Sequence, residues 1–135
     1  MTGLVLKLGP RERILINGAV IENGDRRSRI NIVTPNANIL RLKDAIHPHQ
    51  ANTPVKRVCY VAQLVLSGDA DPDEGSMQLC KGIHQLQAAF QDADSRLNLG
   101  IAQEAIKEGN FYKALKILRG FLSKEDLLLQ RAGAT

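Results

Sequence analysis

Three arginines lie close together in the stretch VIENGDRRSRINI, residues 20–32. Arg26, Arg27 and Arg29 directly follow Asn23-Gly24, a dipeptide that is typical of the turn between two strands because both central residues of the favoured turn adopt positive φ. Arginine adds nothing to that turn, but its planar guanidinium binds phosphate through two parallel hydrogen bonds and stacks on bases. The arginines are therefore either ordinary solvated turn residues or a contact surface for an anion.

The positive charge of the chain is concentrated in its first part. Residues 1–57 hold ten basic and four acidic residues, a formal charge of +6, whereas residues 58–135 hold eight basic and ten acidic residues, a formal charge of −2. Such asymmetry indicates either an anionic partner for the basic part or a device for solubility. Asp25 is expected to pair with one of the arginines that follow it and to reduce the charge left for a ligand.

The basic part contains no aromatic residue, because Phe, Tyr and Trp are all absent from residues 1–57. Base stacking on aromatic rings, as in many single-strand binders, is therefore not available there. Recognition would depend on Arg and Lys contacts with phosphates, on arginine stacking, and on backbone or Asn contacts with bases. No helix-turn-helix pattern precedes a basic helix, which makes duplex DNA the less favoured target.

Residues for catalysis or metal binding do not form a recognisable set. Cys59 and Cys80 fall in apolar helical patterns, which favours buried thiols over a redox pair. The His47-Pro48-His49 pair lacks further ligands, and the acids of residues 69–74 lack the remaining positions of a calcium loop and are better explained as helix-start charges. We predict no catalytic residue, no metal site, no cofactor and no enzymatic activity. With no secretion signal and no membrane-spanning apolar run, the expected location is the cytoplasm.

Short β-branched runs separated by Asn-Gly, Gly-Pro and Thr-Pro turns predict a small antiparallel sheet or barrel of about five strands in residues 1–46. The expected arrangement is either a meander, in which strands adjacent in sequence pair, or a small barrel. The strands are expected at residues 4–8, 13–17, 19–22, 29–33 and 38–43.

Alternation of side chains along the strands assigns two faces to the predicted sheet. The core face is expected to hold Leu4, Leu6, Leu8, Ile14, Ile16, Ile30, Ile32, Leu40 and Leu42. The opposite face and the basic turn together form the predicted RNA-binding set: Lys7, Arg13, Arg26, Arg27, Arg29, Asn31, Arg41 and Lys43.

A bundle of about four helices is expected in residues 54–135, after a linker at residues 47–53, so that the fold class is α+β. Caps predict the starts of the first, second and fourth helices, at Thr53-Pro54, Asp71-Pro72 and Asn110. The expected buried stripes are Leu79, Ile83, Leu86 and Phe90 in the second helix, Leu97, Ile101 and Ala105 in the third, and Phe111, Leu115, Leu118 and Leu122 in the fourth. The last two helices are either one hairpin of the tetratricopeptide type or, as we favour, an ordinary antiparallel pair. The chain after Lys124 is expected to fray.

Six segments of the sequence, spread over nearly the full length of the chain, resemble the flagellar-biosynthesis repressor family FlbT. They are LVLKLGP, INGAVIENGDRRSRI, TPNANILR, DAIHP, ANTPVKRVCY and FYKALK. The resemblance implies a cytoplasmic post-transcriptional regulator, which associates with the 5′ untranslated region of flagellin mRNA and promotes its degradation.

The basic half is also similar to the RNA-binding carbon storage regulator family. Members of that family are dimers in which the first strand of one subunit and the last strand of the other present arginines to a single-stranded GGA loop. By this similarity Lys7 stands at one position of the first-strand arginine pair, Leu6 replaces the other, and Arg41 and Lys43 lie near the last-strand arginine. A sheet of about 45 residues is too small to bury a stable core alone, which independently favours support from the helices, a homodimer, or both.

Two functions of different classes remain open on the sequence. In the first, the basic half binds the flagellin mRNA leader and the helices give support. In the second, the chain is a protein-interaction module whose helices bind a flagellar partner or flagellin itself, so that any effect on mRNA is indirect. Neither function involves a membrane.

Overall fold

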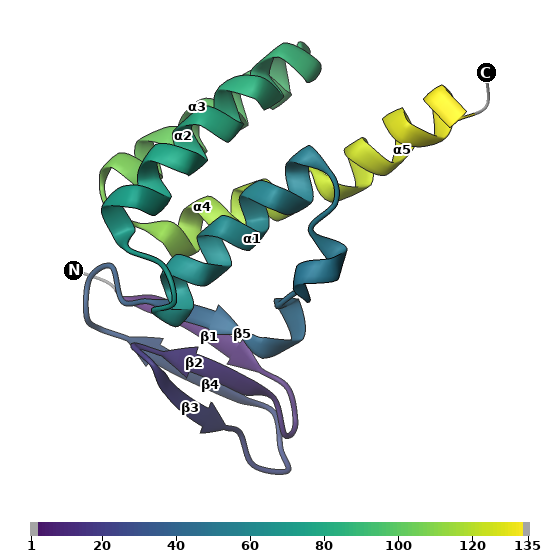
Figure 1. Cartoon of the computed structure of the whole chain (residues 1–135). Coiled ribbons are helices and arrows are strands. Elements are labelled where there is room, and N and C mark those ends of the chain that lie inside the picture. The colour runs from purple at the N-terminus through teal and green to yellow at the C-terminus, as the bar shows by residue number, and fades with distance from the viewer. Residues whose placement is uncertain (1–2, 134–135) are drawn as a thin grey trace.

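The computed structural model describes residues 3–133, and in them five strands are followed by helices, as the predicted α+β class requires (Figure 1). The strands are β1 (Leu4–Leu8), β2 (Arg13–Ile16), β3 (Ala19–Glu22), β4 (Ser28–Ile32) and β5 (Ile39–Arg41).

The strands form two small antiparallel sheets rather than one meander. One sheet pairs β1 with β4, and the other has the order β3-β2-β5. Only β2 and β3 are both neighbours in sequence and paired, across the Asn17-Gly18 turn, where φ is 49° and 86°. The meander expectation was wrong because the chain crosses between the sheets after β1, after β3 and after β4.

Asn23 explains the crossing after β3. Its side-chain amide donates to the carbonyl oxygens of Gly9 at 2.7 Å and Arg26 at 2.9 Å, and its Oδ1 accepts from the Ser28 hydroxyl at 2.7 Å. Neither Asn23 nor Gly24 has positive φ. The expected hairpin turn at this dipeptide was therefore wrong: Asn23 holds a loop that brings β4 beside β1.

The space between the two sheets is filled by Leu6, Leu8, Ile14 and Ile39, all buried. Strand β5 has both faces covered, since Ile39 packs in this core while Leu40 packs among the helices. Most predicted core positions of the sheet are at least half-buried, but Leu4 is 37% exposed, and the burial of Ile39 was not predicted.

The helical part begins with two short 3-10 turns, Leu42–Asp44 and Pro48–Gln50. The α-helices are α1 (Pro54–Ser67), α2 (Pro72–Ala89), α3 (Ala93–Lys107), α4 (Phe111–Arg119) and α5 (Leu122–Gly133). The predicted caps are confirmed, because the side chains of Thr53, Asp71 and Asn110 each accept a hydrogen bond from the backbone N–H three residues later.

The helical core lies among α1, α2, α3 and α4, in which α1 and α3 each pack against both α2 and α4. The buried stripe predicted for α2 is confirmed at Leu79, Ile83, Leu86 and Phe90. The stripe predicted for α3 was wrong at two positions, because Leu97 is 64% and Ile101 37% exposed. Helix α3 packs instead through Leu99, Ala102, Ala105 and Ile106, the row that faces α2 and α4.

Helix α5 replaces the frayed tail that the sequence suggested. Gly120 ends α4, so Leu122 begins α5 and does not belong to the buried stripe that was predicted for the fourth helix. The buried carboxylate of Glu125 accepts a hydrogen bond from the backbone N–H of Val55 at 2.8 Å and another from the Thr53 hydroxyl. This carboxylate fixes the start of α5 to the N-terminus of α1, and the rest of α5 projects from the body (Figure 1).

Candidate nucleic-acid interface

Two cations face each other on the outer side of the β1–β4 sheet. The register places Lys7 opposite Arg29 and Val5 opposite Asn31, and all four side chains are exposed, while the alternate residues Leu6 and Ile30 point inward. Within residues 3–133, neither Lys7 nor Arg29 has a carboxylate partner for its side chain. Like charges directly opposite each other on paired strands are destabilising. An anion bound beside Lys7 and Arg29 would offset this repulsion.

The turn arginines Arg26 and Arg27 are also exposed and without an ion pair among the described residues. Asp25, expected to neutralise one of them, lies 2.8 Å from Nε of Arg11 instead. That expectation was wrong because the Asn23-held loop directs Asp25 back toward the chain before β2, where the backbone N–H of Arg11 also donates to the Gly24 carbonyl.

An open cavity of about 530 Å³ joins the cations of the loop and the sheet. Its lining includes Lys7, Arg27, Arg29 and Lys43, with the Glu12 carboxylate as the only acid among its lining residues. Glu12 is itself engaged by Arg41 at 3.3 Å and lies 4.0 Å from the Lys43 ammonium. We call this cavity and its four cations the basic groove.

Arg13 and Arg41 do not share the open face with Lys7, so their predicted placement was wrong. Both belong to the other sheet. Arg13 lies opposite Glu22 and bonds it at 2.9 Å, which lowers the pKa of that carboxyl. Arg41 lies opposite buried Ile14, is only 18% exposed, and donates to Glu12 and, at 3.0 Å, to the Lys7 carbonyl. These two arginines connect strands.

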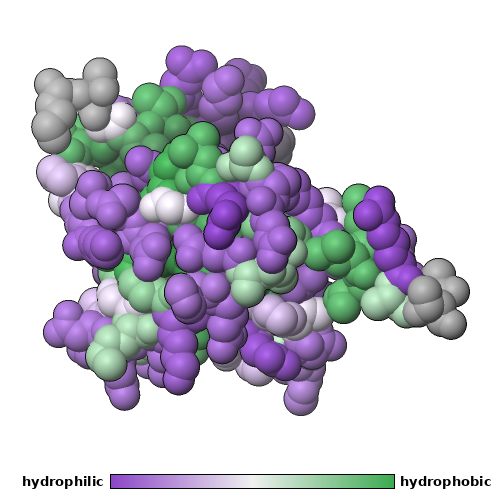
Figure 2. All heavy atoms as spheres, turned by 90° about the horizontal axis from the view of Figure 1, so that it is seen from above, coloured by the Kyte–Doolittle hydropathy of each residue, from purple (hydrophilic) through white to green (hydrophobic). Residues whose placement is uncertain are grey.

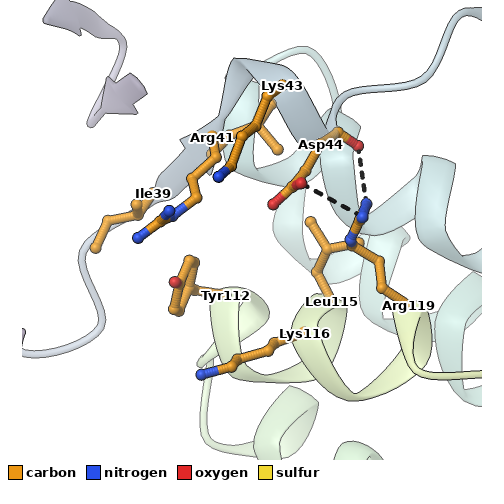
Figure 3. Close-up of a pocket in the computed structure, with 9 residues that line it drawn as sticks. Ile39, Arg41, Lys43, Asp44, Tyr112, Leu115, Lys116 and Arg119 are labelled. Atoms are coloured by element: carbon orange, nitrogen blue, oxygen red, sulfur yellow. Dashed lines mark hydrogen bonds and ion pairs between the residues drawn. The ribbon is translucent and has the colours of Figure 1, made fainter. Parts of the chain in front are cut away.

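A second cationic cavity lies where β5 meets α4, and its helical residues were not predicted. The cavity of about 290 Å³ is lined by Arg41 and Lys43 from one side and by Lys116 and Arg119 from α4 (Figure 3). Arg119 is neutralised by Asp44 at 3.3 Å. The spacing Lys113, Lys116, Arg119 in the sequence was a signal of a basic helix face, but its position beside β5 depends on tertiary packing.

The remaining chemistry-bearing residues do not gather. No group of three His, Cys, Asp or Glu side chains in residues 3–133 could hold a metal ion. Cys59 is buried and Cys80 half-buried, both as thiols, and burial raises the pKa of Cys59 to about 12. Among the described helices, none has both the length and the apolar content to cross a bilayer.

A small α+β protein with an open cationic surface is the class that this fold and site define. The chain belongs to the flagellar protein FlbT family, whose family model matches residues 4–129.

Curated relatives cover nearly the whole chain. The probable flagellum biosynthesis repressor protein FlbT of Rhodopseudomonas palustris strain TIE-1 is 33% identical over 95% of this chain and 98% of its own. FlbT 1 of Bradyrhizobium diazoefficiens, also named a probable flagellum biosynthesis repressor, is 33% identical over 98% of this chain and 88% of its own. The flagellum biosynthesis repressor FlbT of Caulobacter vibrioides strain ATCC 19089 is 24% identical over 91% and 86%. No solved structure matches the chain.

The comparisons confirm the predicted family. The similarity of the basic half to the carbon storage regulator family stays a prediction.

Proposed function

We propose that the chain is a cytoplasmic repressor of flagellin synthesis that binds the 5′ untranslated region of flagellin mRNA through the basic groove and promotes degradation of the message. The supporting observation is the cross-strand pair of Lys7 and Arg29, which has no carboxylate partner in residues 3–133 and is extended by Arg27. The names of the relatives, which describe repressors of flagellum biosynthesis, support the repressor role.

The groove suits a single RNA strand. It is open and lined by exposed cationic side chains, which neutralise successive phosphates, while Arg29 and Asn31 on β4 offer hydrogen bonds to exposed base edges. The sequence placed Arg13 and Arg41 in the binding set. We assign them a structural role instead, because Arg13 already forms an ion pair with Glu22 and Arg41 with Glu12.

A gel shift with the purified full chain and flagellin leader RNA tests the proposal. We expect a complex at low salt that competitor leader RNA removes and that weakens steeply as salt is added, because each neutralised phosphate releases counterions. The absence of any shift at low salt would overturn it. Arg13→Ala serves as the matched control, since it removes an arginine outside the groove and is expected to leave the complex unchanged.

Degradation is assigned to a separate nuclease. We expect the leader RNA to stay intact when incubated with the purified protein alone, and the flagellin mRNA to have a longer half-life in cells that lack the protein. An unchanged half-life would contradict a role in degradation while leaving RNA binding to be judged by the gel shift.

The second candidate function is a protein-interaction module, and exposed apolar residues on the helices favour it. On the projecting helix α5, Leu127, Leu128 and Leu129 are 55%, 42% and 50% exposed, and Figure 2 shows hydrophobic atoms on this projection. A flagellar partner or flagellin would bind there. Binding of such a partner by a chain that gives no gel shift would favour this function over the first.

A homodimer is part of the proposal. Strand β3 is an edge strand with every residue exposed, including Val20 at 61% and Ile21 at 41%, so its unpaired backbone could join a second copy. Size-exclusion chromatography with light scattering at micromolar concentration should give twice the chain mass, and a monomer would exclude the dimer.

A further inference from the structure

The cavity between β5 and α4 shares residues with its neighbours on both sides. Lys43 lines both the basic groove and this cavity. Ile39, Tyr112 and Lys116 line both this cavity and a third one of about 360 Å³, which also contains Lys113. The three cavities are therefore neighbours on the surface between the β1–β4 sheet and the first turns of α4, and each has at least one cation in its lining.

Lys116 is the uncompensated charge of the middle cavity. Arg41 is engaged by Glu12 and Arg119 by Asp44, whereas the exposed Lys116 side chain has no hydrogen bond or ion pair within residues 3–133. Three lysines on the route, Lys43, Lys113 and Lys116, come from two elements that are far apart in the sequence. A ligand with several negative charges at intervals matches this distribution better than a single small anion.

Tyr112 supplies the aromatic ring that the basic half lacks. It is half-buried, packs against both hydrophobic cores, and its hydroxyl makes no hydrogen bond within residues 3–133. In Figure 3 the ring stands between the side chains of Arg41 and Lys116, at the boundary of two cavities. A ring held by packing in a cationic surface is the arrangement on which an unpaired base stacks beside its own phosphate.

We infer that α4 forms the second half of the RNA site: the strand leaves the basic groove past Lys43, an unpaired base stacks on Tyr112, and Lys116 neutralises the adjacent phosphate. The inference rests on the proposed RNA binding and extends it to the helices. It assigns to Tyr112 the aromatic stacking contact that the β1–β4 face, which has no aromatic residue, cannot make, and to Lys116 one further phosphate contact.

Titration of the full chain with labelled flagellin leader RNA tests this inference. Lys116→Ala is expected to lower the affinity about three- to tenfold and to reduce the logarithmic salt slope by about 0.7, the value for one contact with a single strand. Lys81→Ala on α2 is the matched control, because Lys81 is exposed and lines none of the three cavities, and it should leave both quantities unchanged.

Substitution of Tyr112 separates stacking from packing. Tyr112→Phe keeps the ring and should bind within about twofold of the unsubstituted chain, whereas Tyr112→Leu should lose about fivefold or more, the range expected for one lost stacking contact. Because Tyr112→Leu also disturbs packing, the unsubstituted chain is irradiated with leader RNA containing a photoreactive uridine analogue, and a crosslink to α4 is expected.

The outcomes distinguish the inference from the proposed function. If Lys116→Ala binds like Lys81→Ala and no crosslink reaches α4, while Arg27→Ala and Arg29→Ala lose affinity, the inference is overturned and RNA binding by the groove stands. If the unsubstituted chain binds no RNA at all, the proposed function fails and the inference with it.

Discussion

At the residue scale, Lys7 and Arg29 are a pair in which stability and the proposed RNA binding oppose each other. They lie directly opposite on β1 and β4, where like charges are destabilising, and no carboxylate in residues 3–133 offsets them. The alternation of the sequence predicted their common face correctly. It could not predict that Arg13 and Arg41, on strands of the other sheet, already have partners in Glu22 and Glu12.

Lys7→Thr should therefore change stability and RNA affinity in opposite directions. Removal of the repulsion is expected to leave the free energy of unfolding unchanged or to raise it by up to about 1 kcal/mol, while the affinity for leader RNA falls. Thermal denaturation and fluorescence anisotropy measure the two effects on one preparation. A variant that loses stability and keeps its affinity would show that Lys7 has a structural role.

Cys59 should be unreactive in the folded chain. It is buried, and burial raises its pKa to about 12, so almost no thiolate is present near pH 8. In a Cys80→Ser variant, a thiol reagent should label Cys59 only after denaturant is added. Rapid labelling of that native variant would contradict the packing of α1.

At the scale of elements, the sequence predicted what local chemistry determines. The helix caps at Thr53, Asp71 and Asn110 and the positive-φ turn at Asn17-Gly18 all depend on neighbouring residues and are confirmed. Asn23-Gly24 looks the same in sequence but forms no such turn. The Asn23 side chain forms hydrogen bonds with Arg26, Ser28 and also Gly9, which lies 14 residues earlier in the chain.

Two glycine substitutions test this distinction. Gly18→Ala should lower the free energy of unfolding by about 1 kcal/mol, because Gly18 has φ of 86°. Gly24→Ala should be neutral or stabilising, since its φ is not positive and a Cβ there would meet nothing within 4 Å. Chemical denaturation measures the free energy of unfolding of both variants. Equal losses of stability would indicate that Gly24 also has positive φ, as in the hairpin turn that the sequence suggested.

Helix α5 depends on a buried contact that no local pattern reveals. Glu125→Ala should lower the free energy of unfolding by about 1–3 kcal/mol, because it leaves the Val55 N–H buried without its acceptor and removes a negative charge from the N-terminus of α1. Asp126→Ala, at the exposed neighbouring position, is the control and should change it by less than about 0.5 kcal/mol. Equal effects in the two variants would show that Glu125 does not hold α5.

At the scale of the whole molecule, the division of charge along the sequence does not coincide with the arrangement of cations in space. The sequence correctly indicated the α+β class and the FlbT family, and it placed the excess of positive charge in residues 1–57. Folding then brings Lys116 and Tyr112 of the less basic part beside Arg41 and Lys43. Composition alone could not show this, because the contact joins residues about 70 positions apart along the chain.

The central claim is that the chain binds flagellin leader RNA through uncompensated cations of the β1–β4 surface. The most direct measurement is the affinity for that RNA between about 0.05 and 0.2 M salt, for the unsubstituted chain and for the folded Arg26→Ala, Arg27→Ala, Arg29→Ala triple variant. We predict an affinity at least about tenfold lower for the triple variant, a logarithmic salt slope reduced by about 0.7 for each of the three arginines that contacts a phosphate, and a thermal midpoint within a few degrees. Unchanged affinity and slope in a folded triple variant would contradict the claim.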